Sequence, residues 1–269
     1  MRNNIKLLLC AACSAFLLTG CLGKSAGGFL TRQGMEALER GDLNTALTDF
    51  NQAVQNGEET VPALRGLGLT LLGLARYDDA VATFEKALEE ADNRMPQTVR
   101  DITLYELSAL YRCERYEEAV TICHSLLEER KALEPYYYLG ACYLAMGDEE
   151  QAGIYFDEAV ALSPRDYALY LQIYELYEKE NLTAVGDEYL QRALQIQPES
   201  IQDRYRIGQI RFYLEKYDEA RSALSEPVEQ RYLPALELMG EIYLAQEDYD
   251  HAVAIYRTIM EESGESPDT

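Results

Sequence analysis

Adjacent carboxylates are the residues of this chain whose types and spacing could support acid/base chemistry. They occur as three pairs, Asp78-Asp79, Glu117-Glu118 and Glu149-Glu150. Each pair falls in a predicted turn or in the first turn of a predicted helix, where negative charge complements the helix dipole. Because this position explains the carboxylates without catalysis, we assign them no reaction.

The chain carries no sequence motif that marks a nucleophile, a Walker loop or a paired-histidine metal site. Arg65-Gly66-Leu67-Gly68 has closely spaced glycines, but it lacks the preceding strand that a dinucleotide-binding loop requires. His124 and His251 are the only histidines, and neither has the spacing of metal ligands. We therefore expect no enzymatic activity, no metal and no cofactor.

The cysteines fall into two groups. Cys10, Cys13 and Cys21 lie in the first 21 residues, and the rest of the chain holds three more, Cys113, Cys123 and Cys142. An odd number in this second group excludes complete pairing within the chain. The spacing described below predicts Cys123 as a small buried hydrophobic residue, and a disulfide between Cys123 and Cys142 remains an open alternative.

The N-terminal residues have the composition of a targeting segment. Arg2 and Lys6 precede an apolar stretch, residues 7–18, that is too short to cross a bilayer as a helix. Leu18, Thr19 and Gly20 then precede Cys21, and this sequence resembles the lipobox of bacterial lipoproteins. The resemblance implies a lipoprotein signal peptide (residues 1–20), a lipidated Cys21 and a short tether (residues 21–26). The alternative is an uncleaved N-terminal helix.

The charge balance disfavours nucleic acid and anionic lipid headgroups as partners. The formal net charge is −23, with 24 Lys and Arg against 47 Asp and Glu. Removal of residues 1–20 would take away Arg2 and Lys6 alone among the charged residues, and the net charge would become −25. Such a surface repels phosphate and keeps the chain soluble.

A pattern of small and aromatic residues recurs about every 34 residues. In residues 133–166 it consists of Tyr136, Leu139, Gly140, Tyr143, Gly147, Ala152, Phe156, Ala159 and Pro164. This spacing resembles that of tetratricopeptide repeats. Seven segments carry it, at residues 27–60, 61–94, 100–132, 133–166, 167–200, 201–232 and 233–266, and residues 267–269 form a tail. The resemblance implies an all-α, right-handed superhelical solenoid of about seven helix-turn-helix repeats.

The physics of the spacing agrees with this interpretation. Gly68 and Gly140 fall in the middle of predicted helices, where Gly costs about 1 kcal/mol relative to Ala, so we expect a close approach of two helices at each. Pro227 lacks an amide donor and is expected to break or shorten its helix. Residues 95–99 are expected to be an insertion, and a bend is expected there or at residues 226–232.

By the same resemblance, the first helices of the repeats line a concave groove that binds a partner. The candidate residues are Arg65, Leu69, Leu72, Leu104, Tyr111, Arg112, Tyr137, Leu144, Tyr205, Gln209 and Phe212. Apolar and aromatic anchors among a few polar groups suit an extended peptide or a helix. The alternative is that these side chains are ordinary surface aromatics or pack within the solenoid.

Family members that bind chaperones hold a terminal carboxylate with a clamp of Lys, Asn and Arg. This chain has other residues in the clamp-like places, namely Thr31, Met35, Pro62, Leu69, Leu104 and Ser108, which disfavours that activity. At the C-terminal edge, the face around Ile255 and Ile259 has no obvious cover, and self-association through this edge is one hypothesis.

We therefore expect a membrane-anchored scaffold or adaptor in the bacterial cell envelope, without enzymatic activity, that binds another envelope, secretion or surface-assembly protein. Leu22 replaces the Asp that often retains lipoproteins at an inner membrane, so we expect the outer membrane or the outward face of the plasma membrane. The alternative function is an accessory lipoprotein that binds glycan or peptidoglycan, or that regulates an enzyme.

Overall fold

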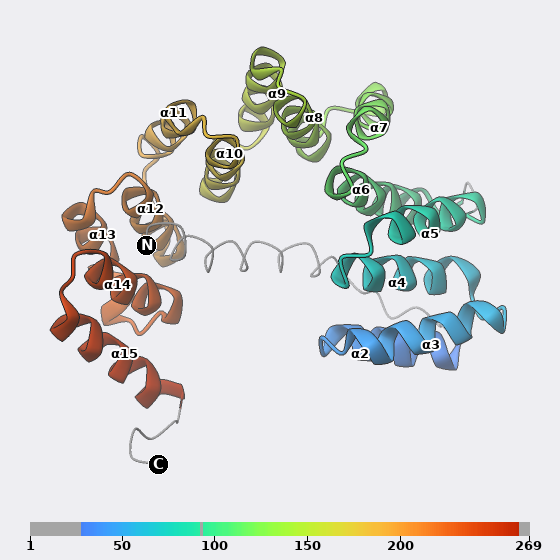
Figure 1. The fold of residues 1–269 in the computed structure, drawn as a ribbon, viewed down its shortest axis with the longest axis horizontal. Coiled ribbons are helices and arrows are strands. Elements are labelled where there is room, and N and C mark those ends of the chain that lie inside the picture. Colours follow the sequence, from blue (N-terminus) through green and yellow to red (C-terminus); the bar gives the residue numbers. More distant parts are fainter. Residues whose placement is uncertain (1–27, 92–93, 264–269) are drawn as a thin grey trace. The chain divides into compact units, whose positions relative to one another are not determined.

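The structure, a computed structural model, describes residues 28–91 and 94–263. These residues form fourteen α-helices and no strand (Figure 1). The helices are α2 (Phe29–Glu39), α3 (Leu43–Gln55), α4 (Thr60–Gly73), α5 (Tyr77–Glu89), α6 (Pro96–Arg112), α7 (Tyr116–Glu129), α8 (Leu133–Ala145), α9 (Glu149–Leu162), α10 (Tyr167–Lys179), α11 (Thr183–Ala193), α12 (Ile201–Tyr213), α13 (Tyr217–Glu229), α14 (Leu233–Ala245) and α15 (Tyr249–Ser263). The predicted all-α fold of paired helices is confirmed. The targeting segment and Cys21 lie outside the described residues.

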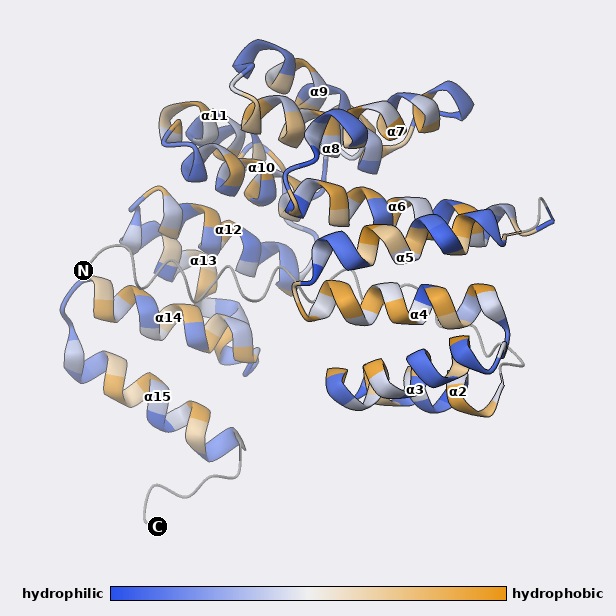
Figure 2. Ribbon diagram, turned by 45° about the vertical axis from the view of Figure 1, so that its right-hand side comes forward, coloured by the Kyte–Doolittle hydropathy of each residue, from blue (hydrophilic) through white to orange (hydrophobic). Residues whose placement is uncertain are grey.

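Consecutive helices pair as hairpins, and each predicted repeat contains one pair. The helices form two compact units that divide between Ala159 and Val160, within α9. The first unit contains α2 to α8 and most of α9, and the second contains the end of α9 and α10 to α15. This division coincides with neither of the two expected bends. Hydrophobic residues recur along the helices of both units (Figure 2).

The turn inside each hairpin uses one residue in the left-handed backbone region. This residue is glycine in two repeats, Gly41 and Gly147, and a residue with a side chain in the others, such as Ala75 (φ 57°). At Ala75 the amide donates to Leu72 O, and the next amide donates to Leu71 O, which together satisfy the last carbonyls of α4. The chain then enters the second helix directly.

The predicted carboxylate pairs lie where the sequence places them, in the first turn of α5, α7 and α9. Two of these carboxylates also bind an arginine at the start of the helix. Asp79 Oδ2 lies 2.6 Å from Arg76 Nη2, and Glu118 Oε1 lies 2.6 Å from Arg115 Nε. These contacts give the carboxylates a structural role at the helix N-termini.

Five of the seven repeats are held together where a glycine of the first helix faces a large residue of the second. A Cβ atom added to Gly140 in α8 would lie 2.5 Å from Phe156 Cδ1 in α9. A Cβ atom added to Gly208 in α12 would lie 2.5 Å from Leu224 Cδ2 in α13. Real Cβ atoms do not approach so closely, so the glycines are required for this packing. The predicted close approach of the helices is confirmed.

The expectation that Pro227 breaks or shortens its helix is wrong. Helix α13 contains Pro227 and has 13 residues, as α5 does. Pro227 lies in the last turn, where one missing amide leaves a single carbonyl without a donor. The amides of Gln230 and Tyr232 still bond to Glu226 O and Pro227 O. Pro227 is buried at the place that Ala193 occupies in α11, where a compact residue is needed.

Residues 95–99 are not a separate loop. Met95 caps α6, and Pro96 is the first residue of this helix, which has 17 residues. Proline suits this place because its missing amide would have no partner in the first turn and its φ angle is already helical. The insertion therefore lengthens the first helix of the third repeat.

Candidate protein-binding surface

All eleven residues of the predicted groove lie on first helices. In the first unit, eight of them lie along α4, α6 and α8: Arg65, Leu69, Leu72, Leu104, Tyr111, Arg112, Tyr137 and Leu144. In the second unit, Tyr205, Gln209 and Phe212 lie on α12. The structure thus places the predicted residues on three first helices of the first unit and on one of the second.

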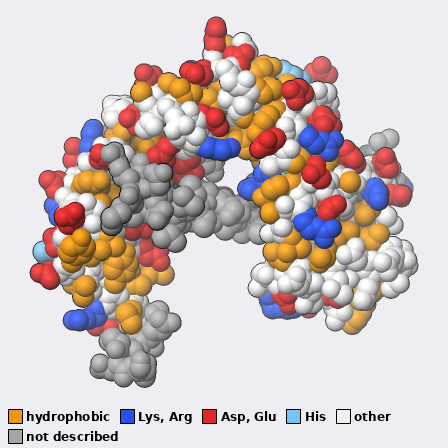
Figure 3. All heavy atoms as spheres, in the orientation of Figure 1, with side chains coloured by type: hydrophobic (Ala, Val, Ile, Leu, Met, Phe, Trp, Pro, Cys, Tyr) orange, Lys and Arg blue, Asp and Glu red, His pale blue; other side chains and the backbone are white. Residues whose placement is uncertain are grey.

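These residues differ widely in exposure. Leu69, Leu144, Gln209 and Phe212 are buried, with exposed fractions between 3 % and 7 %. Leu72, Leu104 and the three tyrosines are partly buried, and Arg112 is exposed. Figure 3 shows hydrophobic atoms beside charged groups over α4 and α5. Arg112 is therefore the one exposed side chain among the predicted residues of the first unit, and Leu72 and Leu104 are partly exposed aliphatic side chains beside the partly exposed tyrosines.

Arg65 links two adjacent repeats. Its Nη2 atom lies 3.6 Å from Asp101 Oδ2 in α6, and its guanidinium lies 5.3 Å from the ring centroid of Tyr105 in α6. The side chain is only 13 % exposed. Its positive charge already interacts with a carboxylate and with an aromatic face, so Arg65 serves to hold α4 against α6.

Aromatic contacts connect α6 to α8 in the same way. The rings of Tyr111 in α6 and Tyr138 in α8 lie 6.1 Å apart in an edge-to-face arrangement. Tyr137 contacts Tyr138 at 5.6 Å and Phe156 of α9 at 6.1 Å. Such pairs contribute about 0.5 to 1.5 kcal/mol each beyond their burial. Tyr138 was not among the predicted groove residues, although its place beside Tyr137 was a signal for it.

Tyr205 and Gln209, two of the three predicted residues of the second unit, contact neighbouring side chains. Tyr205 contacts Tyr232 at 5.5 Å, and Arg206 lies 5.5 Å from the centroid of the Tyr205 ring. Burial raises the pKa of Tyr205 to about 12, so its hydroxyl stays protonated. Gln209 Oε1 accepts a hydrogen bond of 2.7 Å from Arg206. These contacts leave the hydroxyl of Tyr205 neutral and Gln209 satisfied.

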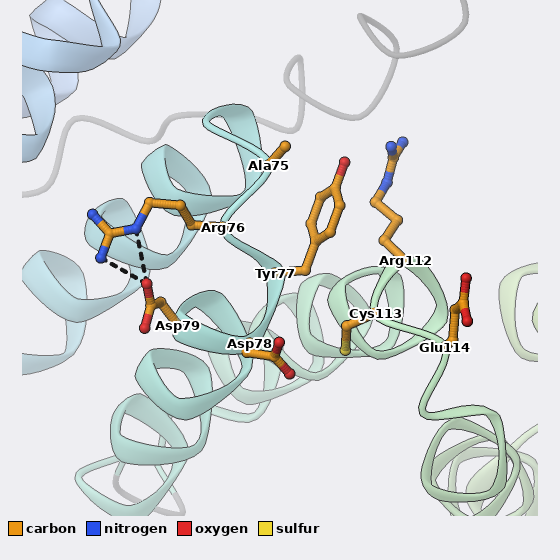
Figure 4. A pocket seen from close by; sticks show the side chains of 8 residues that line it. All are labelled: Ala75, Arg76, Tyr77, Asp78, Asp79, Arg112, Cys113 and Glu114. Carbon is orange, nitrogen blue, oxygen red and sulfur yellow. Dashed lines mark hydrogen bonds and ion pairs between the residues drawn. The ribbon is translucent and has the colours of Figure 1, made fainter.

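A hollow of about 500 Å³ lies beside Arg112, between the turn that precedes α5 and the end of α6 (Figure 4). It is lined by Ala75, Arg76, Tyr77, Asp78, Asp79, Arg112, Cys113 and Glu114. The Arg112 guanidinium lies 5.8 Å from the centroid of the Tyr77 ring. Burial and the nearby Asp78 raise the pKa of the Cys113 thiol, which makes this thiol a poor nucleophile. The hollow suits polar contacts with a partner and not covalent chemistry.

The array of hairpins matches the models of a known repeat family. A model of the tetratricopeptide repeat family matches residues 31–95 and 205–267, and a second model of the same repeat matches residues 133–166. Together these matches cover more than half of the chain. The chain belongs to the tetratricopeptide repeat (TPR) family. TPR proteins bind other proteins and are typically non-enzymatic adaptors.

Individual TPR relatives are distant. Hsp70-Hsp90 organizing protein 3 of Arabidopsis thaliana is 24% identical over 209 residues, which are 74% of this chain and 35% of that protein. The chain thus spans about a third of the length of this relative. MamA of Desulfovibrio magneticus RS-1 is 18% identical with a TM-score of 0.50, over 62% of this chain and 95% of that one. The structure of Pseudomonas aeruginosa pilF is 21% identical with a TM-score of 0.47, over 80% and 96% of the two chains.

The clamp-like places of this TPR array do not present polar side chains to a partner. Thr31, Leu69 and Ser108 are buried, with exposed fractions of 1 %, 5 % and 4 %. Neither Leu69 nor Leu104 can donate a hydrogen bond to a carboxylate. We therefore do not assign recognition of a terminal carboxylate to this surface.

The described residues hold no group of three His, Cys, Asp or Glu side chains that could bind a metal ion. Among these residues, no helix combines the length and the apolar character needed to cross a membrane. Cys123 and Cys142 are free thiols and both are buried. Burial raises the pKa of both, to about 12 for Cys142, so they behave as small hydrophobic residues.

Glu106 of this TPR array gives a testable pH dependence. The side chain is buried in α6, and burial, followed by the charge of Glu85, raises its pKa to about 7 from an ordinary value of 4.5. The folded chain therefore binds this proton more tightly than the unfolded chain does. The stabilising contribution of the protonated form is complete below about pH 4.5 and is lost as the pH rises through 7.

The substitution Glu106→Gln should remove the loss of folding stability that accompanies deprotonation of Glu106. At pH 8 we expect the variant to be more stable on the order of 1 kcal/mol, which raises the melting midpoint by about 2 to 4 °C. The difference should shrink toward pH 5, as measured by thermal unfolding followed by circular dichroism. The control is Glu89→Gln at an exposed site of α5. Equal midpoints for Glu106→Gln and wild type at pH 8 would contradict the burial of a charged carboxylate.

Proposed function

We propose that this chain is a membrane-anchored TPR lipoprotein that acts as a scaffold or adaptor in the bacterial cell envelope. In this proposal, diacylglycerol on Cys21 anchors the chain to the outward face of the plasma membrane or to the outer membrane. The partner is a helix or an extended segment of another envelope, secretion or surface-assembly protein. The anchor rests on the sequence of residues 18–21, and the binding role rests on the repeat array.

The observation that supports the binding role is the chemistry left accessible on α6. Leu104 is partly exposed and Arg112 is exposed, while the neighbouring tyrosines and Arg65 hold α4, α6 and α8 together. Because these helices are already ordered, their accessible apolar and cationic groups can bind an apolar segment without a further loss of conformational entropy in this chain. The acidic chain as a whole also favours partners that carry basic residues near their apolar anchors.

The test is crosslinking of the anchored protein to its neighbours in solubilised membranes, followed by identification of the captured proteins. The variant is Leu104→Ser with Arg112→Ser, and the matched control is Ile154→Ser with Arg130→Ser on exposed sites of α9 and the end of α7. We expect the first pair to reduce capture of one partner at least about tenfold, which corresponds to roughly 1.4 kcal/mol. The control should capture as much as wild type.

Two outcomes would contradict the proposal. In the first, both double variants capture the same proteins in the same amounts as wild type, which would exclude α6 as the binding surface. In the second, protein capture is unchanged while binding of purified peptidoglycan fragments is lost in the α6 variant. That result would assign the surface to a glycan. Circular dichroism of each variant checks that the helices are intact.

A further inference from the structure

The seventh repeat differs from the other six at one place in its second helix. Four residues after the small residue of each second helix stands a residue that packs toward the first helix. In six repeats this residue is 0 % exposed: Phe50, Phe84, Cys123, Phe156, Leu190 and Leu224. In the seventh repeat it is Tyr256 of α15, which is 36 % exposed. The exception lies at the C-terminal edge of the second unit.

In the second and sixth repeats, the first helix of the next repeat covers this place. The Phe84 ring of α5 lies 6.1 Å from Tyr105 of α6 in a stacked arrangement. Leu224 of α13 belongs to one core cluster with Leu238 and Ile242 of α14. The described part of the chain supplies no corresponding helix after α15. The exposure of Tyr256 therefore marks a place that the next first helix covers on α5 and on α13.

The uncovered face of α15 is apolar along its length. Tyr249, Val253 and Tyr256 follow one another at spacings of four and three residues, which places them on one side of the helix. Tyr249 is 62 % exposed and Val253 is 57 % exposed. Val81 occupies the place of Val253 in the second repeat and is 0 % exposed. Figures 2 and 3 show the hydrophobic residues of α14 and α15.

A polar atom beside this face also lacks the donor that a next helix provides elsewhere. Glu175 of α10 and Glu241 of α14 hold the same place in their repeats, directly after the residue aligned with the packing glycine. Glu175 accepts a long hydrogen bond, 3.4 Å, from the hydroxyl of Tyr213 on α12, the first helix of the next repeat. Among the described residues, the buried Oε2 atom of Glu241 has no hydrogen-bond partner. A helix packed against α14 would bring a donor to it.

The negative charge beside the exposed face of α15 disfavours two possible binders of that face, a second copy of this chain and residues 264–269. Burial, followed by the charge of Glu237, raises the pKa of Glu241 to about 7, and Glu237 itself is exposed on α14 one turn before Glu241. A second copy of the chain would bring another net charge of −23 to this edge. Residues 264–269 contain Glu265 and Asp268 and no large apolar side chain. The second copy and residues 264–269 therefore both lack the combination that this surface requires, which is apolar side chains for the stripe on α15 and positive charge for Glu237 and Glu241.

We propose that α14 and α15 bind an amphipathic, basic helix of a partner protein, in the place that the next first helix takes on α5 and on α13. The apolar stripe of the partner helix packs on Tyr249, Val253 and Tyr256. A Lys or Arg of the partner pairs with Glu237 and Glu241. The surface on α14 and α15 shares no helix with the surface proposed on α4, α6 and α8. We therefore expect each surface to bind its partner independently of the other.

The chain itself supplies a probe. Helix α6 covers the equivalent face of α5, and Arg112 occupies in it the place that Tyr213 has in α12. Residues 96–112 carry Arg100 and Arg112 against Asp101 and Glu106, so the probe is made basic by Asp101→Asn and Glu106→Gln. This synthetic, fluorescein-labelled and amidated peptide should bind to α14 and α15 of the whole protein in a saturable manner. Fluorescence anisotropy should show at least about tenfold weaker binding for Val253→Asp, because a carboxylate is placed in the apolar contact. Ile154→Asp, at a site of α9 that is 48 % exposed, is the matched control.

A second peptide that carries R112E distinguishes the contribution of the ion pair to binding from that of the apolar contact. Wild-type protein should bind it at least about tenfold more weakly than the first peptide, and Glu241→Gln should narrow that difference. The proposal is overturned if the first peptide shows no saturable binding, or if Val253→Asp binds it as wild type does. It is also overturned if light scattering shows a dimer that Val253→Asp abolishes, because the occupant is then a second copy. Circular dichroism checks the fold of each variant.

Discussion

Ala152→Leu is expected to lower the midpoint of thermal unfolding by about 2 to 12 °C. Ala152 of α9 is 0 % exposed, as are Ala46, Ala80 and Ala220 at the same place in other repeats. The two helices of this repeat are so close that Gly140 has no room for a Cβ atom beside Phe156. Extra side-chain atoms in such a contact cost about 1 to 3 kcal/mol, and each kcal/mol shifts the midpoint by roughly 2 to 4 °C in a chain of this size.

Helix α9 supplies the matched control for this prediction. Ala161 lies in the same helix and is exposed, so Ala161→Leu adds the same atoms without overpacking. Circular dichroism during heating should show a lower midpoint for Ala152→Leu and a midpoint within about 1 °C of wild type for Ala161→Leu, because surface changes alter stability by about 0.5 kcal/mol or less. Equal midpoints for both variants would show that the hairpin does not depend on a small residue at this place.

The hairpins could be predicted because their signals are local. Small residues recur at fixed places, and the carboxylate pairs mark the first turns of α5, α7 and α9. The fifth repeat shows what a fixed pattern misses. Tyr174 stands where five other repeats have a packing glycine, and Gly186 stands where the other six have alanine. A Cβ atom on Gly186 would lie 3.0 Å from Tyr174 Cδ2, so the two departures from the pattern compensate each other.

The accessibility of the binding surface could not be predicted in the same way. The helical spacing places Leu69 and Leu72 near one face of α4, yet only Leu72 is partly exposed. Exposure depends on the next helix, which contacts one edge of that face. The same reason applies to α15, where the predicted residues Ile255 and Ile259 are partly buried and the exposed residues are Tyr249 and Val253. Which side of a helix is covered follows from the packing of neighbours and not from its own sequence.

Cys21→Ala is expected to move the protein from the membrane fraction to the soluble fraction. The proposed diacylglyceryl group carries two acyl chains, and each buried methylene contributes about 0.8 kcal/mol, so its loss should release nearly all of the protein. The far-ultraviolet circular dichroism of the purified variant should match that of the described helices, because α2 begins only at Phe29. The seven residue-to-residue steps from Cys21 to Gly28 span at most about 25 Å, so an anchor at Cys21 would hold the first repeat close to the membrane surface.

Fractionation of cells and labelling with an alkynyl fatty acid measure this result, and Cys113→Ala provides the matched control. Cys113 is a partly buried free thiol at the end of α6, and its loss should leave the lipid label and the membrane association unchanged. A Cys21→Ala protein that still sediments with membranes would show that another feature anchors the chain. If Cys21→Ala loses the fatty-acid label but still sediments with membranes, the two claims separate. The wild-type protein would then carry lipid on Cys21 without needing it for membrane attachment.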